Sequence, residues 1–291
     1  MDAQRGMKTR FTELVGCTLP LQLAVLGGAG TAELAEAVAA AGGLGMAPAG
    51  VEFSATAHGA IGVGFLMPFA PALDVVAEVA QHVRVVEFFY GEPSAEYVRV
   101  AHGAGALCSW QTGSVAEALA AEQAGCDFVV AQGTEAGGHV RGVMRRDDLL
   151  VGVLAAVTIP VVAAGGIATA AAVASVLALG ADAVRIGTAY VASEESAAHP
   201  AYKAALVAAA GPEDTVLTTH FDEEWPAAPH RVLRTALSRA ELSGNRSINP
   251  PSSYEPGDTS DMAMYAGEGV GAVHAVRDAR AITSDLFGAI S

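Results

Sequence analysis

Eight short apolar runs, separated by alanine-rich segments, constrain the fold of this chain more than any other feature. Most of the runs carry apolar residues continuously, which is typical of strands that are covered on both faces. The segments between them have the length and composition of helices. The runs are Leu21–Leu26, Leu44–Ala47, Ile61–Met67, Val85–Phe89, Leu107–Gln111, Phe128–Ala131, Val161–Ala164 and Val184–Ile186. Strand and helix alternating eight times predicts an α/β fold, a (β/α)₈ TIM barrel.

Helix start signals support this alternation. Thr31, Ser114 with Glu117, Asp147 and Thr169 each precede an alanine-rich or leucine-rich run, in the manner of N-cap residues. A dinucleotide-binding fold is the alternative, because Gly27–Gly30 follows a strand and opens a helix. Glu33 stands where that fingerprint needs its third glycine, so the partial match is weak and the barrel is favoured.

The pattern changes after Gly211, where prolines become frequent. A helix-like segment covers His230–Leu242, a polar stretch follows, and a last helical segment runs roughly from Val270 to Ile290. We therefore predict a barrel over residues 1–211. Residues 212–291 are predicted to form a C-terminal extension, or small lid domain, that returns to the barrel and partly covers its mouth.

Composition excludes several classes of protein. The formal charge is −15, from 31 acidic and 16 basic residues, and 52% of residues are hydrophobic. Such a chain is a poor nucleic-acid binder and too apolar to be disordered. Residues 149–181 carry no charge, but Pro160 and Gly165-Gly166 divide them into pieces too short to span a membrane. The N-terminus does not resemble a signal peptide, and three cysteines without metal-ligand spacing predict buried thiols in the cytoplasm.

Basic residues are scarce in the first half of the chain. Between Phe11 and Val140 only Arg84 and Arg99 occur, so an anionic ligand held there would depend on backbone N–H groups. Gly165-Gly166 and Gly187-Thr188 follow the seventh and eighth predicted strands. Barrels often bind phosphate at these two strand ends, which predicts a phosphate-bearing cofactor; the alternative is a pair of tight turns.

His139 is the strongest candidate for a catalytic residue. It follows Gly137-Gly138 beyond the sixth predicted strand, on the face where barrel active sites lie. An imidazole there can act as a base or hydrogen-bond an anionic substrate, whereas the alternative is a solvated loop histidine. We interpret the nearby Arg145 and Arg146 as a solvated basic face and leave Arg141 open. Structural roles are expected for His58, His82, His102 and His274, and no metal site is predicted.

Several long segments around these residues are similar to one known family. The sequence resembles the FMN-dependent nitronate monooxygenases, also called 2-nitropropane dioxygenases. The likeness covers most of the chain from Pro20 onward. It is carried by AGGLG at Ala41–Gly45, VVAQGTEAGGHVRG at Val129–Gly142, IPVVAAGGIA at Ile159–Ala168, GADAVRIGTAYVASEES at Gly180–Ser196, PHRVLR at Pro229–Arg234 and YAGEGVG at Tyr265–Gly271.

The resemblance implies a barrel that binds FMN without a covalent bond. By position, Ala24, Leu26, Gln132, Gly137 and Gly138 would lie near the flavin, and Ala164, Gly165, Gly166, Gly187 and Thr188 would surround its phosphate. His139 matches the family's active-site histidine. In that chemistry an alkyl nitronate gives one electron to FMN and O₂ accepts an electron. The products are a carbonyl compound and nitrite.

Three positions depart from the family pattern. Val25 and Leu26 replace Pro-Met after the first strand, Gly64 replaces an asparagine, and Glu268 stands where glutamine is common. The departures leave alternatives open: an FMN-dependent enoyl-ACP reductase using NAD(P)H, a phosphate-binding barrel lyase or isomerase, or a non-catalytic flavin-binding protein. The expected partners are a small-molecule substrate and O₂, without nucleic acid or membrane, and a homodimer is left open.

Overall fold

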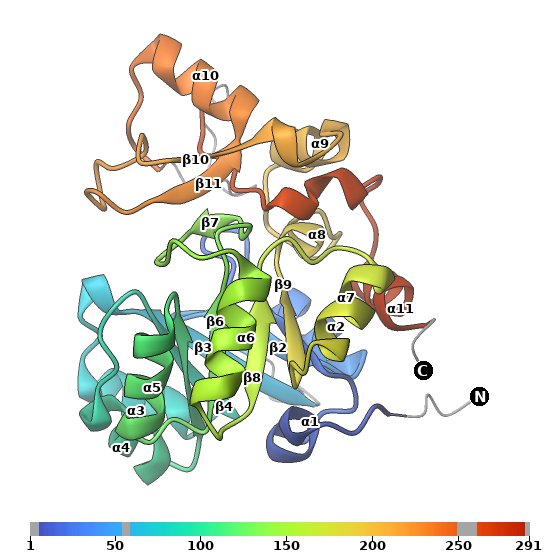
Figure 1. Ribbon diagram of the computed structural model, residues 1–291. Helices are drawn as coiled ribbons and strands as arrows, with labels where there is room; N and C mark the ends of the chain where they lie inside the picture. The colour runs from blue at the N-terminus through green and yellow to red at the C-terminus, as the bar shows by residue number, and fades with distance from the viewer. Residues whose placement is uncertain (1–5, 54–58, 249–260, 289–291) are drawn as a thin grey trace.

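Eight parallel strands close into a barrel at the centre of the molecule (Figure 1). The computed structural model describes residues 6–53, 59–248 and 261–288. The barrel strands, in their order around the sheet, are β1 (Leu21–Leu23), β2 (Leu44–Pro48), β3 (Ala60–Leu66), β4 (Val85–Phe89), β5 (Leu107–Thr112), β6 (Phe128–Gln132), β8 (Val161–Ala164) and β9 (Ala183–Ile186). The sheet closes where β1 pairs with β9, with Leu21 beside Val184. The predicted barrel is confirmed, and its closure excludes the open dinucleotide-binding sheet.

The first strand is shorter than its apolar run suggested. It ends at Leu23, although the Ala24 N–H still donates to the Ile186 carbonyl at 2.9 Å. Residues 24–26 then leave the sheet at its C-terminal edge. Local apolarity does not distinguish a strand from the buried loop that continues it, because both are packed on the same core.

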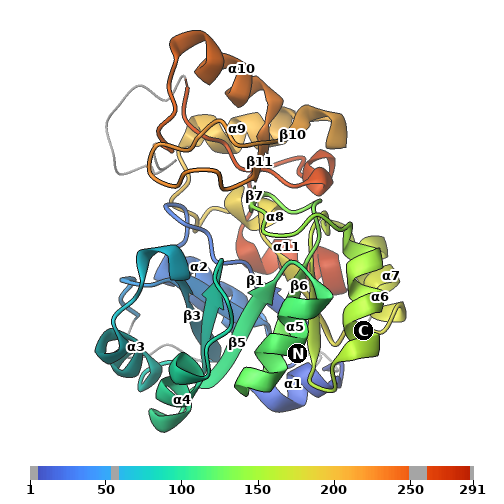
Figure 2. The ribbon, with the colours of Figure 1, turned by 60° about the vertical axis from the view of Figure 1, so that its left-hand side comes forward.

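Helices surround the barrel and cover the outer faces of its strands (Figures 1 and 2). They are α2 (Ala32–Ala40), α3 (Leu73–Ala80), α4 (Ala95–Gly103), α5 (Val115–Ala124), α6 (Arg146–Ala156), α7 (Ala170–Ala178) and α11 (Ala279–Phe287). The short helices α1 (Arg10–Val15) and α8 (Thr188–Val191) lie at the two ends of the barrel. The hydroxyls of Thr31, Ser114 and Thr169 each accept the N–H three residues on, so these predicted caps are confirmed. The predicted cap at Asp147 is wrong, because α6 begins at Arg146.

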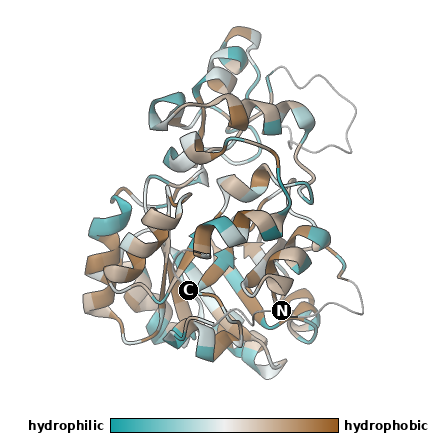
Figure 3. Ribbon diagram, turned by 90° about the vertical axis from the view of Figure 1, so that its right-hand side faces the viewer, coloured by the Kyte–Doolittle hydropathy of each residue, from teal (hydrophilic) through white to brown (hydrophobic). Residues whose placement is uncertain are grey.

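The hydrophobic core runs through the barrel and the surrounding layer of helices, where hydrophobic residues recur along strands and helices (Figure 3). The N-terminal α1 lies at the end of the barrel opposite the candidate site. Phe11 of α1 meets Phe128 of β6 edge to face, with 5.3 Å between ring centroids. Arg10 clamps the same end by donating to both carboxylate oxygens of Asp182. This end is therefore packed shut, and the opposite end carries the loops.

A second group of elements lies beyond the C-terminal ends of the strands (Figure 2). A small antiparallel sheet is formed by β10 (Thr215–Thr218), β11 (His230–Leu233) and the two-residue β7 (Gly138–His139). It is flanked by α9 (Pro200–Ala208) and α10 (Arg234–Ser243), and single 3₁₀ turns occur at η1 (Met67–Phe69), η2 (Pro212–Asp214) and η3 (Glu268–Ala272).

Two predicted helices after Gly211 need correction. Residues 230–233 are a strand and not the start of a helix, because β10 and β7 pair with them on both sides. The final helix begins at Ala279, where the Asp278 carboxylate caps it, and not near Val270. This α11 packs against α2 and α7. The division into residues 1–211 and 212–291 stays a prediction.

No helix in the described ranges is both long and apolar enough to cross a membrane. The charge-free stretch 149–181 divides into most of α6, β8 and α7, as predicted. Cys108 and Cys126 are buried free thiols, whereas Cys17 is partly exposed. Burial raises the pKa of Cys17 to about 12, so this thiol stays protonated at neutral pH.

Candidate functional site

The predicted cofactor-binding residues all lie at the C-terminal edge of the barrel. Ala24 and Leu26 follow β1, and Gly187 follows β9, which is the neighbouring strand. A Cβ atom built on Gly187 would lie 3.2 Å from the Ala24 Cβ and 3.7 Å from Leu26 Cδ2. These three positions are therefore in direct contact, and Thr188 continues from them into α8.

A second set of predicted residues surrounds the loop after β6. The Gln132 side chain is buried and donates from Nε2 to the His139 carbonyl at 2.9 Å. Its Oε1 faces the Arg141 N–H at 3.5 Å. Gln132 thus fixes the backbone from His139 to Arg141. Gly137 and Gly138 precede the histidine, and Gly138 shares β7 with it.

The turn after β8 has backbone geometry that suits glycine. Gly165 and Gly166 have φ angles of +120° and +66°, which residues with a side chain rarely adopt. Their N–H groups, and that of Gly187, donate no hydrogen bond to any other described residue. Unsatisfied N–H groups at adjacent strand ends form an anion-binding arrangement. The backbone here therefore fits a phosphate group.

His139 lies in a cluster of aromatic rings above the strand ends. Its imidazole stacks on Trp225 with 4.1 Å between ring centroids and 24° between planes. His230 and Tyr265 lie 5.3 and 5.7 Å away, and Tyr90, which follows β4, is 6.2 Å away. Because β7 pairs with β11, His139 and His230 stand directly opposite each other across two strands. The small sheet therefore brings His139 and His230 together over the barrel mouth.

Burial dominates the electrostatics of this cluster. It lowers the pKa of His139 to about 3, with the neighbouring His230 as the lesser cause. Burial also lowers the pKa of His230 and raises that of the Tyr265 hydroxyl. All three groups are therefore neutral at pH 7. The Nε2 atoms of His139 and His230 and the Tyr265 hydroxyl are buried, with no hydrogen-bond partner in the described chain.

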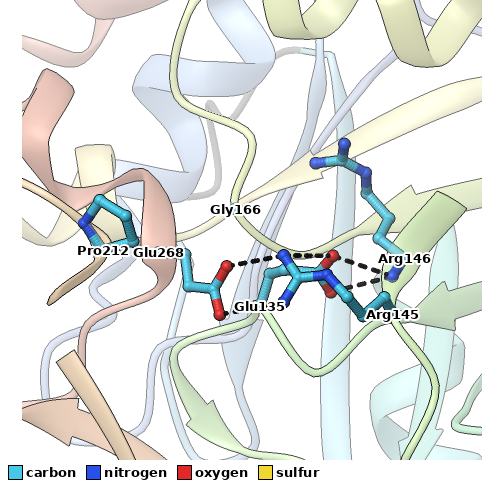
Figure 4. Close-up of a pocket in the computed structure, with 6 residues that line it drawn as sticks. All are labelled: Glu135, Arg145, Arg146, Gly166, Pro212 and Glu268. Atoms are coloured by element: carbon cyan, nitrogen blue, oxygen red, sulfur yellow. Dashed lines mark hydrogen bonds and ion pairs between the residues drawn. The ribbon is translucent and has the colours of Figure 1, made fainter.

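A charged cavity of about 250 Å³ lies against the glycine turn (Figure 4). It is lined by Glu135, Arg145, Arg146, Gly166, Pro212 and Glu268. Arg145 reaches both carboxylates, at 3.3 Å from Glu135 and 2.9 Å from Glu268. The Glu268 N–H donates to the Glu135 carbonyl at 2.9 Å, which ties the YAGEGVG segment to the loop after β6. Glu268, one of the departures from the family pattern, therefore takes part in ion pairs.

The structure revises the role expected for one of the cations near the site. The Arg146 side chain is only 15% exposed and donates to the Gly165 carbonyl at 2.8 Å, so its assignment to a solvated face is wrong. Arg145 is 61% exposed, as expected. Arg141 is held by Glu117 and Glu92, and Arg185 is buried against Glu87. Arg146 is thus the cation in contact with the glycine turn.

Among the histidines expected to have structural roles, one has a side-chain partner and one is not described. His102 pairs with Asp127 at 2.8 Å, and His58 lies outside the described residues. Groups of acidic residues, histidines and cysteines suited to a metal are absent from the described ranges.

The partners of His139 lie far from it in the sequence. Trp225 lies in the loop between β10 and β11, His230 on β11, and Tyr265 beyond a gap in the described chain. PHRVLR and YAGEGVG did stand out as family-like segments, and these contain His230 and Tyr265. No local signal linked them to His139, and Trp225 carried no signal of any kind.

Similarity to known proteins identifies the family of this chain. The model of the family described as nitronate monooxygenase matches residues 54–275. The chain belongs to the nitronate monooxygenase family. A nitronate monooxygenase of Pseudomonas aeruginosa is 38% identical over 162 residues, which are 53% of this chain and 46% of the relative. The chain thus matches less than half the length of that relative.

Two solved structures match over almost their whole length. FabK from Thermotoga maritima is 31% identical with a TM-score of 0.85, and the match covers 97% of this chain and 96% of FabK. A nitroalkane oxidase from Streptomyces ansochromogenes is 30% identical with a TM-score of 0.77, covering 96% and 97%. Membership and neighbours together indicate a flavin-dependent oxidoreductase.

Proposed function

We propose that the protein binds FMN and oxidises an alkyl nitronate with O₂ to a carbonyl compound and nitrite. The placement of His139 is the observation that carries this proposal. Its neutral imidazole lies at the barrel mouth, with a buried Nε2 that no described residue satisfies. A buried polar atom of this kind is costly unless a ligand completes its hydrogen bond.

The glycine turns fit the phosphate of the cofactor. Gly165, Gly166 and Gly187 present free N–H groups, and Arg146 adds a cation held on the Gly165 carbonyl. Ala24, Leu26, Gln132, Gly137 and Gly138 border the same edge of the barrel, and Ala164 and Thr188 flank the turns. We propose these residues as the FMN site. When bound, FMN supplies the redox group through which electrons pass from substrate to O₂.

His139 then binds and orients the substrate. A neutral imidazole can donate to an oxygen of the nitronate, or accept a proton at Nε2 from the carbon next to a nitro group. Gln132 fixes its backbone through the 2.9 Å bond, and Trp225 covers one face of the ring. Trp225 and His230 also keep bulk water away from Nε2, which strengthens the hydrogen bonds made there.

The spectrum of freshly purified protein gives the first test. Yellow protein whose flavin is bleached anaerobically by propionate 3-nitronate, with nitrite formed on admitting O₂, supports the proposal. Colourless protein that stays colourless after FMN is added and the excess removed would refute it. In His139→Asn we expect FMN to be retained and turnover to fall by about 10²-fold or more. Unchanged turnover would show that His139 is a bystander.

FMN-dependent reduction of an enoyl-ACP is the second candidate activity. EAGGH at Glu135–His139 and AAGGIA at Ala163–Ala168 are also found in FMN-dependent enoyl-ACP reductases, and the structure brings the two segments together at the glycine turn. Rapid anaerobic bleaching by NADH or NADPH, without reaction with a nitronate, would favour this alternative. Yellow protein inert to both classes of substrate would indicate a flavin-binding protein. The lyase or isomerase alternative needs a barrel without flavin, which the family match disfavours.

Two further predictions concern the setting of the enzyme. The free thiols of Cys108 and Cys126 support a reducing compartment, and we propose the cytoplasm. Small-molecule substrate and O₂ are the proposed partners, and the oligomeric state is left open.

A further inference from the structure

Three unpartnered polar atoms gather beside one another above the barrel. They are His139 Nε2, His230 Nε2 and the Tyr265 hydroxyl, each buried. The ring centroids lie 5.3 Å apart for His139 and His230, 5.7 Å for His139 and Tyr265, and 5.9 Å for His230 and Tyr265. One such atom can be a local defect, but three in mutual ring contact indicate a site where a ligand completes the bonds.

The small sheet explains why the three rings meet. His230 on β11 stands opposite His139 on β7, and Val232 stands opposite Tyr265 in an antiparallel bridge. Residues directly opposite each other in an antiparallel pair share one face, and so do residues two apart along a strand. His139, His230 and Tyr265 therefore project from the same face of the sheet.

The hydrogen bond at the other ring nitrogen of His230 decides what its Nε2 can do. Nδ1 lies 2.8 Å from the Ala228 carbonyl oxygen, which can only accept. Nδ1 therefore carries the hydrogen. Burial lowers the pKa of His230, so the ring has no second proton, and its Nε2 presents a lone pair. His230 is a fixed hydrogen-bond acceptor.

The Tyr265 hydroxyl has the complementary character. Burial raises the pKa of this phenol, which stays protonated and can donate. The cluster thus offers a donor at Tyr265 and an acceptor at His230, both beside His139. A ligand with acceptor oxygens alone would satisfy Tyr265 and leave His230 unpaired.

We propose that His230 determines substrate specificity by accepting a hydrogen bond from a hydroxyl or N–H group close to the substrate's nitro or nitronate group. Tyr265 donates to an oxygen of that group. This inference rests on the proposed function and deepens it: the preferred substrate is a hydroxyl- or amino-substituted nitro compound and not a simple nitroalkane. A buried acceptor left without its partner discriminates strongly between two otherwise similar substrates.

Two probes of equal size test this. The nitronates of 2-nitroethanol and 1-nitropropane differ by a hydroxyl in place of a methyl group. We expect wild-type kcat/KM to favour 2-nitroethanol by about tenfold relative to the ratio found in His230→Phe, which removes the acceptor. His230→Gln keeps an acceptor oxygen and should keep much of the preference. Tyr265→Phe should lower kcat/KM for both substrates by a similar factor. His220→Phe is the matched control, because His220 bonds to the Asn245 carbonyl instead.

Calorimetric titration with the two neutral nitro compounds separates this inference from the proposed function. A protein that oxidises neither nitronate overturns the proposed function, yet tighter binding of 2-nitroethanol that is lost in His230→Phe still supports the role of His230. Equal binding and equal kcat/KM for the two probes in wild-type protein overturn it. A hydroxyl preference that survives in His230→Phe overturns it as well.

Discussion

At the scale of single residues, His139 owes its character to burial. Its pKa falls to about 3, mainly because the charged form loses its hydration among Trp225, His230 and Tyr265. The imidazole is therefore neutral throughout the physiological range and can share a hydrogen bond without first losing a charge.

This shift predicts how stability depends on pH. Below the unfolded pKa of 6.5 the imidazole of the unfolded chain gains a proton, while the folded one stays neutral down to about pH 3. The unfolded state then binds more protons, so stability falls as the pH falls. From pH 7 to pH 5 we expect wild-type protein to lose up to about 2 kcal/mol more unfolding free energy than His139→Asn. Urea denaturation measures it, and equal losses in the two proteins would contradict the shift.

Gly166 provides a second prediction at this scale. Its φ is +66°, and a Cβ atom would lie 3.1 Å from the Glu135 Cβ. Gly166→Val should therefore block the approach of the phosphate and release FMN, measured as flavin absorbance after gel filtration. Gly244→Val is the matched control, because Gly244 has φ +77° but open space around it. Full flavin content in Gly166→Val, or equal loss in both variants, would refute the phosphate site.

At the scale of elements, two of the departures from the family pattern, at Val25 and Gly64, are coupled because the two residues pack against each other. A Cβ atom on Gly64 of β3 would lie 2.5 Å from Val25 Cγ2, in the segment that follows β1. The valine methyl occupies the space that a larger residue at position 64 would need. Val25 and Gly64 thus compensate each other in packing, although the sequence shows them as separate differences.

Their coupling can be measured by a double-mutant cycle. Gly64→Ala alone should destabilise the fold by about 1–3 kcal/mol, because the Val25 side chain is stiff and must shift. Val25→Ala should relieve most of that cost when the two are combined. Additive changes in unfolding free energy, without an interaction of at least about 0.5 kcal/mol, would show that the two positions are independent.

At the scale of the whole molecule, a buried ion pair spans the interior of the barrel. Arg185 on β9 and Glu87 on β4 belong to strands that are not neighbours, and both side chains are at most 6% exposed. Gln22 on β1 donates to the same carboxylate at 2.8 Å. The network therefore links opposite sides of the closed sheet.

Removing one partner of this ion pair should destabilise the fold far more than replacing both partners with apolar residues. Glu87→Leu leaves a buried guanidinium without its partner, which costs about 3–5 kcal/mol, whereas Glu87→Leu with Arg185→Met should recover most of that loss. Thermal and urea unfolding of the three proteins measure the difference. If the double variant were no more stable than Glu87→Leu, unpaired charge would not be the cause.

The sequence by itself determined the barrel, the caps at Thr31, Ser114 and Thr169, and the glycine turns at Gly165 and Gly187. These depend on hydrophobic periodicity, local hydrogen bonds and backbone freedom, all of which act between residues close along the chain. His139 was found in the same way, from its place after a strand and two glycines.

Only the tertiary structure decided what surrounds that histidine. His230 lies on β11, whose pairing with β7 overrides the helical pattern of residues 230–233. Trp225 reaches the histidine from the loop before β11, and Tyr265 from a later segment. Arg146 was expected at the surface, but its side chain lies at the glycine turn because the Gly165 carbonyl accepts its hydrogen bond there. Contacts between residues so far apart in sequence come from strand pairing and the packing of the whole chain, which local patterns do not encode.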